Sequence, residues 1–161
     1  MIKQEYHFGY EVYDSISELP EADRQLLNQA RQITAAAYAP YSRFLVGATA
    51  LLANGAIVNG TNQENASYPV GICAERVLLS SASMLHTGVP VETMAIAYHN
   101  LEGASNTPVS PCGMCRQYLR EYEDRTGKPI RLILSGMEGA VYVISEARQL
   151  LPLSFGGESL K

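Results

Sequence analysis

The sequence has little charge, few cysteines and no long hydrophobic run, and each shortage excludes a class of protein. Charged residues make up 17% of the chain and the formal net charge is -4, which argues against a long nucleic acid as the partner. No apolar stretch approaches the ~20 residues needed to cross a bilayer, and the N-terminal segment lacks a signal-peptide core. Three cysteines, an odd number, do not make a secreted disulfide framework. We expect a cytoplasmic protein with no membrane or nucleic-acid partner.

The chain is long enough for one domain with a full core. No internal repeat, low-complexity run or linker divides its 161 residues. We expect an N-terminal arm at residues 1–19 and a single folded domain at 20–161. Within the arm, Tyr6, Phe8, Tyr10 and Val12 alternate with polar or small residues, as in an edge strand. The arm is either ordered against the domain or a disordered tail.

The pattern of apolar residues predicts helices and strands in the order α-β-β-α-β-α-β-β. The first helix begins near residue 17 and continues to residue 38. Asn54-Gly55 is a hairpin signal, so the two strands that flank it should be antiparallel neighbours. The simplest packing is a three-layer α/β/α sandwich around a mixed five-stranded sheet. The other elements are expected at 43–52, 56–61, 74–84, 91–98, from 111 onwards, 129–134, 140–144 and 146–151.

All three cysteines lie in two short runs, Cys73-Ala-Glu75 and Pro111-Cys112-Gly-Met-Cys115. Each run precedes or opens a predicted helix, and Pro111 suits a first helical position. The exposed N–H groups and positive dipole end of a helix N-terminus favour a thiolate over a thiol. Three thiolates can hold one zinc ion and leave its fourth tetrahedral position open, which is the pattern of a catalytic site.

Two other interpretations of these cysteines remain open. A C-x-x-C pair in a cytosolic protein is often a redox pair or half of a structural zinc site, and Cys73 could be an ordinary buried cysteine. The carboxylate of Glu75, two residues after Cys73, favours the catalytic interpretation. Zinc deaminases place an acid/base glutamate at this offset and follow it with Pro-Cys-x-x-Cys.

Several further motifs extend this similarity over roughly residues 26–160. The sequence resembles the small, homotetrameric cytidine deaminases of pyrimidine salvage, which are zinc-dependent hydrolases acting on nucleosides. Residues before about Leu19 extend beyond the usual start of that family. The motifs are Tyr38-Ala-Pro-Tyr-Ser-x-Phe-x-Val-Gly-Ala, Gly60-x-Asn-x-Glu-Asn-Ala-Ser-Tyr, Cys73-Ala-Glu-Arg, Ser110-Pro-Cys-Gly-x-Cys-Arg-Gln and Leu150-Leu-Pro-x-x-Phe.

The resemblance implies a role for each residue around the metal. One zinc ion per subunit is expected on Cys73, Cys112 and Cys115. Glu75 is the expected catalytic acid/base, which moves protons between water, the pyrimidine ring and the departing amine. Three thiolates give the centre a net negative charge, which Arg76 is expected to offset from the second shell. A solvated helix arginine is the alternative for Arg76.

The resemblance also implies the substrate-binding residues. Asn62 and Glu64 are expected to hold the ribose hydroxyls, since an amide and a carboxylate can bond a diol; the alternative is a polar loop that caps its own backbone. Phe44 is expected on the pyrimidine face, or else in the strand core. The N–H of Ala74 is expected on the base O2. Phe155, with Tyr68 nearby, is expected to reach a neighbouring subunit's site in a homotetramer.

The function implied is hydrolytic deamination of cytidine and deoxycytidine to uridine and deoxyuridine, with release of ammonia. A deaminase of a cytosine-bearing antibiotic nucleoside is an alternative, which the intact Asn62-x-Glu64 run disfavours. An RNA-editing deaminase is another, which the acidic balance disfavours. The last alternative is a protein in which the zinc ion only stabilises the fold and catalyses no reaction.

Overall fold

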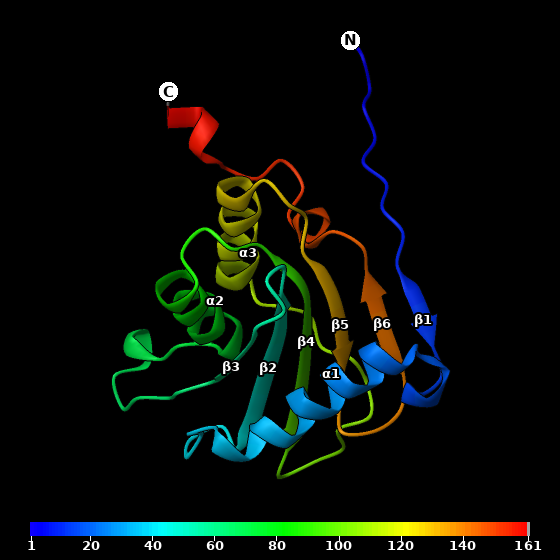
Figure 1. Ribbon diagram of the computed structural model, residues 1–161, viewed down its shortest axis with the longest axis vertical. Helices are drawn as coiled ribbons and strands as arrows, with labels where there is room; N and C mark the ends of the chain where they lie inside the picture. The colour runs from blue at the N-terminus through cyan, green and yellow to red at the C-terminus, as the bar shows by residue number, and fades with distance from the viewer. Residues whose placement is uncertain (161) are drawn as a thin grey trace.

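The computed structural model describes residues 1–160, and in this part of the chain six strands form one sheet with helices on both faces (Figure 1). The strand order is β1-β6-β5-β4-β2-β3. No helix within residues 1–160 is long and apolar enough to cross a membrane. The elements are β1 (Glu11–Tyr13), α1 (Glu21–Ile33), β2 (Phe44–Leu52), β3 (Ile57–Thr61), α2 (Ala74–Leu85), β4 (Val91–Asn100), α3 (Gly113–Thr126), β5 (Arg131–Ser135) and β6 (Val141–Ile144), with short 3-10 turns between them.

The α/β class is confirmed, but the expected number of five strands is wrong. The sixth strand is β1, which pairs antiparallel with β6 at the sheet edge. The alternation in the arm indicated an edge strand, which was not counted in the sheet, and the open edge of β6 supplies the hydrogen-bonding groups that order it. Tyr10 also packs its ring on Tyr142 of β6, with 5.1 Å between centroids. The arm is therefore attached to the domain through β1 and Tyr10, and also through the Tyr6 hydroxyl, which donates to Gln149 O at 3.0 Å.

The sheet divides the core into two layers. Strands β2 and β3 form the expected antiparallel hairpin, and Gly55 adopts the left-handed φ of +82° that the turn requires. Strands β4 and β5 are parallel. One apolar core lies between the sheet and the two cysteine helices, α2 and α3. The other lies under α1, which crosses the opposite face (Figure 1).

The helix boundaries differ from the expected ones. Helix α1 ends at Ile33 and not at residue 38, because one 3-10 turn follows and the chain then bonds to another segment through Tyr38 N and Asn62 O, 3.1 Å apart. Cys73 and Cys112 are the N-cap residues of α2 and α3, while Cys115 lies in the first turn of α3. Pro111 precedes the N-cap and is not the first helical residue.

Gly60 in β3 fixes the position of α2. A Cβ atom at residue 60 would lie 2.6 Å from Leu78 N and would also collide with Ala74 O. These are backbone atoms of α2, which cannot move without shifting the helix. Absence of a side chain at residue 60 therefore lets the N-terminal half of α2, which follows Cys73, rest directly on the sheet.

We expect Gly60→Ala to destabilise the fold by about 1–3 kcal/mol, the usual cost of overpacking. A thermal melt should show a fall of about 2–4 °C for each kcal/mol lost. The matched control is Gly9→Ala, where a Cβ meets no atom within 4 Å and the melting temperature should not change. Equal melting temperatures for both variants would show that α2 is not held by this contact.

Candidate active site

The three cysteines meet where the N-termini of α2 and α3 lie side by side. Cys73 Sγ is 3.7 Å from Cys112 Sγ, and Cys112 Sγ is 3.5 Å from Cys115 Sγ. All three sulfur atoms lie within 4.8 Å of one another. The two runs are 39 residues apart at Cys73 and Cys112, so the packing of both helices on the same sheet face brings them together.

This geometry fits a zinc ion. Four ligands at ~2.3 Å in a tetrahedron place neighbouring sulfur atoms about 3.8 Å apart, close to the two distances observed here. The donor set also fits, because zinc prefers thiolates and a catalytic site uses three protein ligands. Cys115 is fully buried, Cys73 is half-buried and Cys112 is exposed, so the cluster lies at the protein surface with one side open.

The cluster favours ionisation at one of its sulfurs. Hydrogen bonds from the Cys115 and Cys112 thiols, assisted by the charge of Arg76, lower the pKa of Cys73 to about 6. The same hydrogen bond to Cys73, together with burial, raises the pKa of Cys115. The cluster therefore favours a thiolate at Cys73 with a protonated thiol at Cys115, and a divalent cation bound there would displace the thiol protons.

Glu75 lies in the first turn of α2 beside these sulfurs. Its side chain is buried, with 5% of the residue exposed. Burial raises the pKa of the Glu75 carboxyl, and the charge on Cys73 raises it further, while a hydrogen bond from Cys115 lowers it. A surface glutamate would show none of these effects. The carboxyl can therefore hold a proton closer to neutral pH than an exposed glutamate can.

The next residue, Arg76, carries its charge to the edge of the cluster. Its guanidinium lowers the pKa of Cys73 through charge alone. Its nearest described polar partner is Met114 Sδ, 4.0 Å from Nη1. An arginine placed beside a thiolate can offset the negative charge of a three-thiolate centre.

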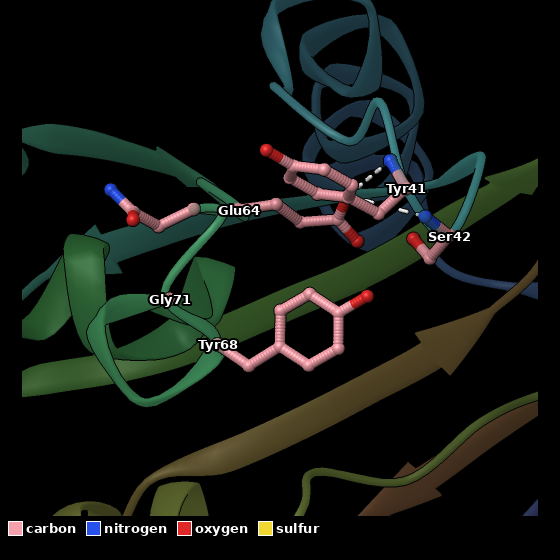
Figure 2. A pocket seen from close by; sticks show the side chains of 6 residues that line it. Tyr41, Ser42, Glu64, Tyr68 and Gly71 are labelled. Atoms are coloured by element: carbon pink, nitrogen blue, oxygen red, sulfur yellow. Dashed lines mark hydrogen bonds between the residues drawn. The ribbon is translucent and has the colours of Figure 1, made fainter.

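A cavity of about 330 Å³ lies beside the loop that leads to Cys73 (Figure 2). Its lining comes from the turn before β2 and from the loop after β3. Four lining residues were given no role from the sequence, although Tyr41, Ser42 and Asn65 stand in the motifs quoted above. The lining residues are Tyr41, Ser42, Glu64, Asn65, Tyr68 and Gly71.

The loop between β3 and α2 is closed by a backbone pair. Gln63 N donates to Ile72 O over 2.9 Å, and Ile72 N donates to Gln63 O over 3.0 Å. This pair brings the two ends of the loop together, so that Glu64 lies near the segment carrying Cys73 although eight residues separate them. The cavity and the cysteine cluster therefore share one loop.

Glu64 accepts two hydrogen bonds from the turn before β2. Its Oε2 receives Tyr41 N at 2.9 Å and Ser42 N at 3.2 Å, as Figure 2 shows. Burial raises the pKa of Glu64, but these bonds and one from the Ser42 side chain outweigh it, so the pKa is lowered and the group is a carboxylate. Glu64 thus holds the turn that precedes Phe44 and presents its charge to the cavity.

Asn62 and Phe44 lie on the sheet face that carries the cysteine helices. The Asn62 amide bridges the start of β2, accepting from Val46 N at 2.8 Å and donating to Phe44 O at 2.9 Å. The Phe44 ring stacks on Tyr98, with centroids 4.6 Å apart and planes 11° apart. Both side chains therefore have structural contacts of the kind that the sequence left open as alternatives, and the Asn62 amide keeps one further N–H.

The remaining predicted substrate contacts lie at three different places. Ala74 is buried and is the first residue of α2, so its N–H projects from the helix N-terminus. Tyr68 is 76% exposed and packs edge-on against Tyr41 at the cavity, with 5.9 Å between centroids. Phe155 is 58% exposed and lies along α3, where Gln117 Nε2 donates to its carbonyl at 3.0 Å. Phe155 is not among the residues that line the described cavity.

Comparison with protein families finds one matching model. It is the cytidine and deoxycytidylate deaminase zinc-binding region, and it matches residues 20–127. This range includes all three cysteines and Glu75, and begins after the N-terminal arm.

Individual proteins show the same similarity. The chain is 37% identical over 139 residues to a cytidine deaminase of Halalkalibacterium halodurans, covering 86% of this chain and 98% of that protein. It is 40% identical over 105 residues to a cytidine deaminase of Mycobacterium tuberculosis, covering 65% of this chain and 74% of that protein. A crystal structure of cytidine deaminase from Burkholderia pseudomallei superposes with a TM-score of 0.72 at 34% identity, covering 85% of this chain and all of that one.

Proposed function

The chain belongs to the cytidine and deoxycytidylate deaminase family, and from this premise we propose that it hydrolyses cytidine to uridine and ammonia through a single zinc centre. The observation that carries the proposal is the gathering of three thiol groups at zinc spacing with one buried carboxyl beside them. We extend the substrate range to deoxycytidine, because both nucleosides carry the same cytosine base, on which the reaction takes place.

We propose that Cys73, Cys112 and Cys115 hold the zinc ion, one per chain. When bound, the ion acts as a Lewis acid that makes a water molecule nucleophilic near neutral pH. Three thiolate ligands leave one coordination position for that water. The charge of Arg76 beside Cys73 supports its role in offsetting the charge of the ligand set.

Glu75 carries the proton transfers in this proposal. Its carboxylate accepts a proton from the attacking water and delivers a proton to ring N3 of the pyrimidine. It then transfers the proton of the new C4 hydroxyl to the exocyclic amine, the C4–N bond breaks as the C4 carbonyl forms, and the overall change is one water consumed and one ammonia released. Burial supports this role, because it raises the pKa of Glu75 towards the value at which a group both gives and accepts protons.

We propose that the nucleoside enters with its sugar beside Glu64 and its base over the cysteine cluster. The anionic Glu64 side chain can accept from sugar hydroxyls while it retains its two backbone bonds, and the free N–H of Asn62 can donate to them. The N–H of Ala74 is proposed for the base O2. Phe44 is proposed for the pyrimidine face opposite Tyr98.

We propose a homotetramer in which Phe155 and Tyr68 contribute to a neighbouring chain's site. Large apolar side chains are exposed close to the ends of the cysteine helices, and a subunit interface would cover them. They include Tyr68, Val70, Met84, Leu85, Met114 and Phe155. A monomer in sedimentation equilibrium would contradict this assembly.

We propose that the protein acts in pyrimidine salvage in the cytoplasm. A centre of three thiolates requires reduced cysteines, and a reducing compartment keeps them so. Cell fractionation that placed the protein in an oxidising compartment would contradict this location.

The test of the activity is incubation of purified protein with cytidine while absorbance and ammonia are followed. We expect equal amounts of uridine and ammonia, similar turnover of deoxycytidine, and loss of activity on treatment with a zinc chelator that returns when zinc is added. Free cytosine is the control substrate, and it should react far more slowly because it makes no sugar contacts. Absence of ammonia release from zinc-loaded protein would refute the function.

A further inference from the structure

Arg116 follows the last cysteine and binds two segments of backbone at once. Its Nε donates to Pro111 O over 2.8 Å, and its Nη1 donates to Leu150 O over 2.9 Å. Pro111 is the residue immediately before the proposed ligand Cys112 and is itself buried. The main-chain N–H of Arg116 donates to Cys112 O at 2.9 Å. One residue therefore fixes both carbonyls at the start of α3.

The second partner of Arg116 begins the C-terminal segment, residues 150–160. Two further side chains of α3 hold this segment. Gln117 Nε2 donates to Phe155 O at 3.0 Å, and Arg120 Nη2 pairs with Glu158 Oε1 at 2.6 Å. Arg120 contacts none of the described backbone of residues 110–115. Among these three anchors, Arg116 alone is bonded on one side to the cysteine turn and on the other to the C-terminal segment.

We infer that Arg116 is a positioning residue that couples zinc retention to the docking of the C-terminal segment on α3. The guanidinium presents two N–H groups in a fixed fork, so holding one carbonyl orients the other. Movement of Leu150 would then release Pro111, and the Cys112 sulfur would lose its position relative to the sulfurs of Cys73 and Cys115. This inference rests on the proposed zinc ligands.

This role of Arg116 differs from that of a cation that offsets the negative charge of the zinc ligands. Both described Arg116 bonds go to backbone carbonyls, not to sulfur. Lysine keeps the positive charge but has a single flexible ammonium, which does not reproduce the fork. The substitution Arg116→Lys therefore separates the two explanations.

The experiment measures how fast a chelator removes zinc from the loaded protein, with a colorimetric zinc indicator and no substrate. We expect Arg116→Lys to release zinc on the order of ten-fold faster than the unaltered chain, within the range found when groups that orient metal ligands are lost. The matched control is Arg120→Lys, one turn further along α3, which leaves Leu150 and Pro111 bonded to Arg116 and should release zinc at the normal rate. Normal release from Arg116→Lys together with fast release from Arg116→Gln would show that charge matters and would overturn the inference.

A second measurement uses the unaltered chain, in case Arg116→Lys does not fold. Limited proteolysis is followed by mass spectrometry with zinc bound and after zinc removal. We expect cleavage within residues 151–160 to accelerate on zinc removal, before any cleavage within α1. Equal cleavage of the C-terminal segment with and without zinc would overturn the coupling. A purified protein that holds no zinc would instead refute the proposed function, so the two failures are distinct.

Discussion

Replacing Glu75 with glutamine should reduce the turnover of cytidine on the order of 10³-fold, the middle of the range for general acid–base catalysis. Glutamine is close in size to glutamate and keeps a polar side chain in the buried space beside Cys115, so the fold should persist. The amide can neither accept the water proton nor pass a proton to ring N3. Zinc content should remain at one ion per chain, because Glu75 is proposed as a proton carrier and not as a ligand. Steady-state rates and metal analysis of the same preparation check both statements.

Two matched variants isolate the effect of that carboxyl. Glu121→Gln changes an exposed glutamate on α3 and should leave turnover unchanged. Arg76→Gln removes the cation beside Cys73 and should slow the reaction less than Glu75→Gln while zinc is retained. Near-normal turnover of zinc-loaded Glu75→Gln would refute the proton-transfer role, and equal rates for Arg76→Gln and the unaltered chain would show that Arg76 does not tune the centre.

Replacing Cys115 with serine should abolish activity by removing the metal. Cys115 is the fully buried member of the trio, and its sulfur lies 3.5 Å from that of Cys112. A serine hydroxyl is a poor zinc ligand at neutral pH, because zinc sites of this kind are built from thiolates. Removing a direct ligand should weaken binding by more than the ~10–100-fold found for groups that only orient ligands. We expect the purified variant to hold little zinc and to show no measurable deamination.

The control for Cys115→Ser is the unaltered chain stripped of zinc. Both should be inactive and should melt at similar temperatures, since metal binding at such a centre contributes to folding stability. Added zinc should restore activity to the stripped chain but not to the variant. Full zinc content and activity in Cys115→Ser would remove this residue from the proposed ligand set.

The sequence predicted the parts of the fold that depend on local patterns. The hairpin at Asn54-Gly55 has a strong turn signal, and the cysteine helices have apolar faces that pack on the sheet. The sequence failed where tertiary contacts decide the outcome. The strand Glu11–Tyr13 forms because β6 has an open edge, and α1 stops at Ile33 although the helical spacing of apolar residues continues to residue 38.

The sequence indicated the metal centre of the site in more detail than the cavity beside it. Metal chemistry restricts the ligands to a few residue types, so three cysteines and a nearby glutamate were enough to indicate the centre. The cavity beside it is formed by Tyr41, Asn65 and Gly71, whose roles follow from the shape of two loops. The bonds that Asn62 and Glu64 make to the backbone around β2 also require the fold. Nothing in the sequence indicated that Arg116 joins two segments, because one of its carbonyl partners, Leu150, is 34 residues away.

X-ray absorption at the zinc edge tests the central claim most directly, since it reports the atoms bound to the metal in the intact protein. The account predicts three sulfur neighbours at about 2.3 Å and one lighter atom at about 2.0 Å. It also predicts that the sulfur count falls to two in any fraction of Cys112→Ser that retains zinc. Four sulfur neighbours, or a first shell without sulfur, would contradict an open centre held by Cys73, Cys112 and Cys115.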